Sequence, residues 1–96
     1  MELLIEVVDI KGSCPVYNIG DSFKLLDGFK LWAEHPLCMH SLASLMPYYN
    51  ALSRGISPAE MGLSREKDKA YLQCLDPCDY TGGGTVVFQI LRLNTG

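Results

Sequence analysis

The stretch TVVFQILRL, Thr85–Leu93, decides the fold of this chain. It is rich in β-branched and aromatic residues, which favour an extended backbone. Its apolar residues occupy both odd and even positions, so they fall on both faces of a strand. A strand that is apolar on both faces is typical of the interior of a sheet. We therefore predict that Val86–Leu91 lies in a central strand.

Four further segments have strand character. Asp27 and Gly28 separate two apolar runs, and this dipeptide is a strong hairpin signal because both residues tolerate the positive φ angles of a tight turn. The other segments are rich in β-branched and apolar residues that lie between turn signals. The predicted strands are Leu3–Ile10, Ser22–Leu26, Phe29–Trp32 and Ala70–Leu75.

The stretch HPLCMHSLASLMPYYNAL, His35–Leu52, has the pattern of a helix. Pro36 suits the first helical position, because its missing N–H would be unpaired there. Pro47 should kink the helix or split it in two, since proline clashes with the preceding turn. Gly55 should end it. The apolar stripe that would face the core is Cys38, Leu42, Leu45, Tyr49 and Leu52.

A second, short helix is predicted within SPAEMG, Ser57–Gly62, with Ser57 as its N-cap and Pro58 as its first residue. Together these elements predict a single α+β domain over residues 1–96. We expect a mostly antiparallel sheet packed against one kinked main helix plus a short helix. A chain of 96 residues leaves no room for a second core.

The composition excludes several classes of protein. A net charge of −3 and a pI of about 5.2 do not supply the basic surface that nucleic-acid binding needs. The first ten residues contain three acidic side chains and no basic one, so they do not form a signal peptide. No apolar run approaches the ~18 residues of a membrane span. We therefore expect a cytoplasmic protein that binds neither nucleic acid nor membrane.

Four cysteines are the strongest chemical signal in the sequence. They are Cys14, Cys38, Cys74 and Cys78, and all fall at predicted element ends or in loops, where sites are usually built. Cytoplasmic thiols stay reduced unless they bind metal or do chemistry. Their spacing matches neither a zinc ribbon nor a C-x-x-C redox motif, so the spacing by itself is a weak metal signal.

Cys38 would be the third helical residue if Pro36 is the first. Free N–H groups and a partial positive charge at a helix N-terminus favour a thiolate, and therefore a ligand or a nucleophile. The alternative is that Cys38 is a small apolar residue at the head of the buried stripe. His35 and His40 are weaker ligand candidates, since His35 would simply cap the helix and His40 points away from Cys38.

The order GSCP…IGDSF…LC…A…MPYYNALSRG…QCLDP…VVFQILRL resembles a family of small, mostly uncharacterised proteins that is common in anaerobic bacteria and archaea. The resemblance covers about Gly12 to Leu93. It implies that Cys14, Cys38 and Cys74 recur together, and it implies no activity. Cys78 is not clearly part of the pattern, and GISPAEMG replaces an aromatic stretch of the family.

Three functions follow as hypotheses. The first is a metal or iron–sulfur site in which Cys14, Cys38 and Cys74 converge and Cys78 is the fourth ligand. Four thiolates suit zinc or an iron–sulfur cluster, and an anaerobic family favours a 4Fe-4S cluster. Such a protein would be an accessory or electron-transfer subunit of a larger redox enzyme, or a homo-oligomer. The second is a non-enzymatic protein-interaction domain with structural cysteines, and the third is a thiol redox enzyme that uses Cys38.

Overall fold

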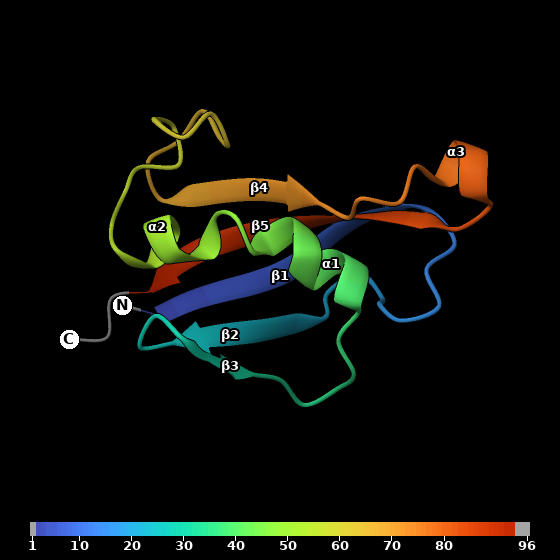
Figure 1. Cartoon of the computed structure of the whole chain (residues 1–96), viewed down its shortest axis with the longest axis horizontal. Helices are drawn as coiled ribbons and strands as arrows, with labels where there is room; N and C mark the ends of the chain where they lie inside the picture. The colour runs from blue at the N-terminus through green and yellow to red at the C-terminus, as the bar shows by residue number, and fades with distance from the viewer. Residues whose placement is uncertain (1, 94–96) are drawn as a thin grey trace.

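The structure, a computed structural model, describes residues 2–93 and contains a five-stranded antiparallel sheet with the order β3-β2-β1-β5-β4 (Figure 1). Three short helices accompany the sheet in this part of the chain. The fold is therefore α+β, as the sequence predicts. The strands are β1 (Glu2–Gly12), β2 (Ser22–Leu26), β3 (Lys30–Trp32), β4 (Lys69–Gln73) and β5 (Gly84–Leu93), and the helices are α1 (Met39–Leu45), α2 (Tyr49–Ser53) and α3 (Cys78–Thr81).

The strand β5 lies inside the sheet, between β1 and β4. The prediction of a central strand over Val86–Leu91 is confirmed. Val86, Phe88 and Ile90 point into the core and are almost fully buried, whereas the alternate residues are half-buried on the other face. The long pairing of β1 with β5 joins the two ends of the described chain, because Glu2 lies opposite Leu93.

The predicted hairpin between β2 and β3 is also confirmed. Asp27 and Gly28 have φ angles of 56° and 84°, and the Phe29 N–H donates to the Leu26 carbonyl at 3.2 Å. Positive φ at both central residues is the mark of a type I′ turn, which matches the twist of the two strands.

The prediction of one kinked main helix is wrong, because the structure has two short helices, α1 and α2, in its place. Pro47 lies between them, and the expected split is what occurs. Proline has no N–H to continue the ladder of hydrogen bonds, so the chain turns and α2 begins at Tyr49. The start is also later than predicted: Pro36 is outside the helix, and α1 begins at Met39 with Cys38 as its N-cap.

The predicted helix over Ser57–Gly62 is a set of turns in the structure. The Met61 N–H donates to the Ser57 carbonyl and the Leu63 N–H to the Pro58 carbonyl, so a single turn forms and stops. Gly62, with a φ of 75°, lets the chain leave it. Conversely, the segment Cys78–Thr81, which lies outside all the predicted strands and helices, forms the short helix α3.

The helices α1 and α2 cover one face of the sheet, and the core lies between these helices and the sheet (Figure 1). Three aromatic rings form its centre: Tyr17 and Phe88 meet edge to face at 5.6 Å between centroids, and Phe23 contacts both. Such pairs add to the stability that burial provides. The buried cluster is Leu3, Ile5, Val7, Tyr17, Phe23, Leu25, Leu45, Leu52, Ala70, Cys74, Val86, Phe88 and Ile90.

The helices described within residues 2–93 are too short to cross a bilayer, and none of them qualifies as a membrane span.

Candidate functional site

Two facing glycines mark one end of the sheet, which we call the glycine end. Gly12 of β1 lies opposite Gly84 of β5, so side chains at these positions would point to the same face. Gly84 is two residues from the buried Val86, so this is the face that carries the core. At these two positions the glycine end therefore has no side chain on the face where the helices pack.

The backbone of Gly83 and Ser13, together with the neighbouring Cys78 and Cys14, occupies the space that the two missing side chains leave. A Cβ added at Gly12 would lie 3.2 Å from the Cys78 Cβ and 3.4 Å from its Sγ. A Cβ added at Gly84 would lie 2.8 Å from the backbone nitrogen of Cys14, closer than real Cβ atoms approach. The glycine pair thus brings Cys14 and Cys78 to the same end of the sheet, although they are far apart in the sequence.

The sulfur of Cys14 is the acceptor of two backbone hydrogen bonds. The N–H groups of Val16 and Tyr17 donate to it at 3.5 and 3.3 Å. The turn CPVY forms because Pro15 fixes its own φ and directs the chain back toward the sulfur. Two backbone N–H groups therefore point at one sulfur. Cys14 is half-buried, so this sulfur remains close to solvent.

Tyr17 links this turn to the start of α1. Its hydroxyl accepts a hydrogen bond from the Cys38 N–H at 3.0 Å and lies 2.8 Å from the Ser41 Oγ. Ser41 donates its own proton to the Cys38 carbonyl at 2.7 Å, so Tyr17 must be the donor to Ser41. Burial raises the pKa of Tyr17, which keeps the hydroxyl protonated as this network requires.

Cys38 is the N-cap of α1 and not its third residue, so the predicted position is corrected by three residues. Its backbone is extended, with φ and ψ of −84° and 128°, and its N–H donates to the Tyr17 hydroxyl. Cys38 is half-buried and packs against the core cluster. Its backbone N–H is taken by Tyr17, so it is not one of the free donors that the sequence argument invoked.

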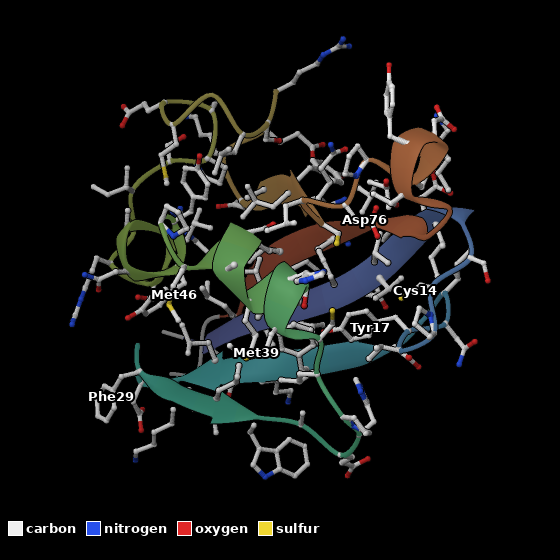
Figure 2. The ribbon with its side chains drawn as sticks, turned by 45° about the vertical axis from the view of Figure 1, so that its right-hand side comes forward. Cys14, Tyr17, Phe29, Met39, Met46 and Asp76 are labelled. Carbon is white, nitrogen blue, oxygen red and sulfur yellow. The ribbon has the colours of Figure 1, made fainter. Side chains whose placement is uncertain are left out.

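Cys74 and Cys78 are more buried than the other two cysteines. Cys74 follows β4, its N–H donates to the Val86 carbonyl at 2.8 Å, and its side chain belongs to the core. Cys78 begins α3, where its N–H donates to the Thr85 Oγ1 at 3.3 Å. Asp76 lies between them in the sequence. Figure 2 shows Asp76 at the same end of the sheet as Cys14 and Tyr17.

The four thiols are free, and two of them border the glycine pair directly, Cys14 and Cys78, whereas the Cys74 N–H bonds to Val86, two residues further along β5. Cys38 reaches the same region through Tyr17. Within residues 2–93 no group of three or more His, Cys, Asp or Glu side chains is arranged so that it could hold a metal ion. The convergence of Cys14, Cys38 and Cys74 on one metal therefore stays a prediction.

His35 has a structural role instead of a site role. Its Nδ1 lies 3.0 Å from the Pro36 carbonyl and its Nε2 lies 3.1 Å from the Ser22 carbonyl. Because both acceptors are carbonyls, the doubly protonated ring satisfies both contacts. These two bonds raise the pKa of His35, the bond to Pro36 contributing most.

Two features were missed by sequence reasoning. The first is the Tyr17–Ser41 pair, whose only signal is a tyrosine two residues after the Cys14-Pro15 dipeptide. The second is an apolar groove of about 180 Å³ between α1 and the β2–β3 hairpin, at the end of the sheet opposite the glycine end. In Figure 2, Phe29 and Met46 lie at that end. The groove is lined by Leu3, Ile5, Phe23, Leu25, Phe29, Leu31, Leu42, Leu45, Met46, Tyr49 and Ile90.

Comparison with known proteins leaves the family of this chain open. No protein-family model matches it, and no curated protein or solved structure matches it either. The resemblance to a family of small cysteine-containing proteins from anaerobes therefore stays a prediction, and the function has to be argued from the residues themselves.

Proposed function

We propose that this protein binds a soft metal centre, either zinc or an iron–sulfur cluster, through thiolates at the glycine end of its sheet. The observation that supports this most is the pair of backbone N–H groups that donate to the Cys14 sulfur. Hydrogen bonds to ligand sulfurs orient them and set the potential of iron–sulfur sites. Cys38 is the second proposed ligand, because it is half-buried and joined to the Cys14 turn through Tyr17.

Cys74 and Cys78 would complete the set. Both lie at the glycine end, one just after β4 and the other at the start of α3. Four thiolates are the donor set that zinc and iron–sulfur clusters prefer. Since no three His, Cys, Asp or Glu side chains within residues 2–93 are placed to hold one metal ion, binding requires the loop after β1 or the loop after β4 to move.

The place of the site suits an accessory role in electron transfer. Cys14 and Cys38 are only half-buried, so a centre bound to them would lie near the molecular surface. A redox partner could then approach it without opening the core. An accessory or electron-transfer subunit of a larger redox enzyme is the role that fits this placement.

Metal analysis of anaerobically purified protein tests the proposal. We expect about one zinc ion or one cluster per chain, with iron, acid-labile sulfide and absorbance near 400 nm in the second case. Cys14→Ser and Cys38→Ser should each lose most of the metal. Met39→Leu, an exposed change next to Cys38, is the matched control and should retain it. Metal-free wild-type protein, or full metal content in both serine variants, would contradict the proposal.

A second candidate function is a protein-interaction domain in which the cysteines are structural. The apolar groove between α1 and the β2–β3 hairpin favours it, because its lining side chains are open to solvent at Phe29 and Met46. Metal analysis of the wild-type protein distinguishes the two candidates. Under the metal proposal the wild type binds metal and a chain with all four cysteines changed to serine does not, whereas under the second candidate the wild-type protein is already metal-free.

A further inference from the structure

The strand β3 is an open edge of the sheet. It is the first strand in the order β3-β2-β1-β5-β4, so within the described residues only β2 pairs with it. All three of its residues, Lys30–Trp32, are exposed. An exposed edge presents unpaired backbone N–H and C=O groups, which can pair with another strand.

The two faces of this edge are both apolar. Leu31 lies opposite the buried Leu25, so it points to the side of the helices, and it is 47% exposed. Trp32 lies opposite Lys24, so it points to the uncovered face of the sheet, and it is 53% exposed. Edge strands are usually protected by charge, proline or a bulge. Only Lys30 provides such protection here.

The apolar surface continues from the edge into the groove. Phe29, at the tip of the hairpin, is 71% exposed, and Met46, at the end of α1, is 61% exposed. Both line the groove together with Leu31. Figure 2 shows Phe29 at the outer end of the hairpin, with Met46 on the helical side of the same region.

The opposite edge of the sheet is less available. The strand β4 lies there, and the Tyr71 N–H at its outer side donates to the Leu63 carbonyl at 2.9 Å. The segment that contains Leu63 therefore covers part of the β4 edge. Pairing with a further strand is favoured at β3.

We propose that a second copy of this chain occupies the β3 edge, so that two sheets join through antiparallel β3 strands around a two-fold axis at Leu31. Antiparallel pairing about that residue places Leu31 against Leu31 of the second copy on the helical side. It places Lys30 opposite Trp32 of the second copy on the other side, where an ammonium group can lie over an indole ring. An interface of this kind is self-complementary, as a two-fold dimer requires.

The area at this edge fits a weak, reversible dimer. The exposed parts of Phe29, Leu31, Trp32 and Met46 amount to roughly 450 Å² in each copy, or roughly 900 Å² for the pair, given the usual areas of such side chains. Specific interfaces bury about 1,200 Å² or more, and transient ones fall below that. The other groove residues and the backbone of β3 add further buried area to this side-chain estimate.

The single tryptophan provides a direct test, because Trp32 lies in the proposed interface. Sedimentation velocity and tryptophan fluorescence are measured on wild-type protein from about 10 µM to about 1 mM. We expect a monomer–dimer equilibrium and a blue shift of the emission with the same midpoint. Leu31→Lys should weaken the dimer by roughly tenfold or more, since it removes apolar area and puts like charges opposite each other.

Leu75→Lys is the matched control, since Leu75 is an exposed leucine that follows β4 at the other edge. It should dimerise like the wild type. If Leu31→Lys fails to fold by circular dichroism, Leu31→Ser replaces it, with the same expected loss of the dimer. The proposal is overturned if the wild type is monomeric at about 1 mM. It is also overturned if the dimer survives both Leu31 variants, or if Leu75→Lys abolishes it.

Discussion

The hydroxyl of Tyr17 joins two segments that are 21 residues apart in the chain. It accepts a hydrogen bond from the Cys38 N–H and donates one to the Ser41 Oγ, so it holds the start of α1 against the Cys14 turn. The sequence contains a reasonable helix start at Pro36, and local rules place the first turn there. The structure places it three residues later, with Cys38 extended and its N–H bonded to a hydroxyl that is distant in the sequence. Prediction rules that use only residues adjacent in the sequence cannot take such a contact into account.

The first prediction concerns Tyr17→Phe. This change leaves the Cys38 N–H and the Ser41 hydroxyl without their partner in a buried place, and we expect a loss of about 1–3 kcal/mol in the free energy of unfolding. Urea denaturation of the two proteins measures it. Tyr80→Phe is the control, because Tyr80 is 91% exposed and should change the free energy by less than about 0.5 kcal/mol. Equal stability of Tyr17→Phe and wild type would mean that water replaces the hydroxyl.

The second prediction concerns pH and His35. Its pKa is raised in the folded state by bonds to the Pro36 and Ser22 carbonyls, so protonation stabilises the fold. This contribution of His35 to the free energy of unfolding is fully present below its unfolded pKa of about 6.5, and it is lost as pH rises through its folded pKa. The difference in free energy of unfolding between wild type and His35→Gln should therefore be larger at about pH 5.5 than at about pH 8.5. Urea titrations at both values test this, and a difference that grows with pH would contradict it.

The elements with a strong local signal were predicted well. The strand β2 and the turn at Asp27-Gly28 follow from a dipeptide that tolerates positive φ, and this signal needs no tertiary contact. Pro47 ended α1 because its backbone nitrogen has no proton, wherever the rest of the chain lies. The short helices were predicted poorly. A single turn such as Ser57–Gly62 or Cys78–Thr81 is too short to form by propensity, so its packing decides the outcome.

The third prediction concerns the connection between β5 and α2. The Nε of Arg92 donates to the Leu52 carbonyl at 3.0 Å, near the end of α2, where a cation also interacts favourably with the helix dipole. Arg92→Ala removes this bond and the buried part of the side chain, and it should destabilise the protein by about 1–2 kcal/mol. Thermal unfolding measures the change. Arg54→Ala is the control, because Arg54 is exposed and its side chain bonds only to Asn50 among the described residues.

At the scale of the whole molecule, the sheet order could not be read from the sequence. The apolar pattern of Val86–Leu91 predicted that β5 is central, but it did not predict which strands pair with β5. In the structure β5 pairs with β1 and β4, and its pairing with β1 places residues near the two ends of the sequence side by side (Figure 1). The candidate site depends on the same pairing. Gly12 and Gly84 meet only because β1 and β5 pair, and Cys78 and the Cys14 backbone can pack against them because these glycines lack side chains.

The last prediction follows from this pairing. Glu2 lies opposite Leu93, so forming the β1–β5 pair in the natural order closes a very long loop, which slows folding. A circular permutant that joins the C-terminal residues to the N-terminus by a short Gly/Ser linker, and opens the chain between the exposed Glu66 and Lys67, turns the pair into a hairpin. We expect it to keep the fold and to refold roughly tenfold faster or more, from the smaller loop entropy. Stopped-flow fluorescence of Trp32 measures both rates. An unchanged refolding rate, with the fold intact, would mean that β1 and β5 pair only after the rate-limiting step, and that the hairpin of β2 and β3 or the packing of α1 sets the rate.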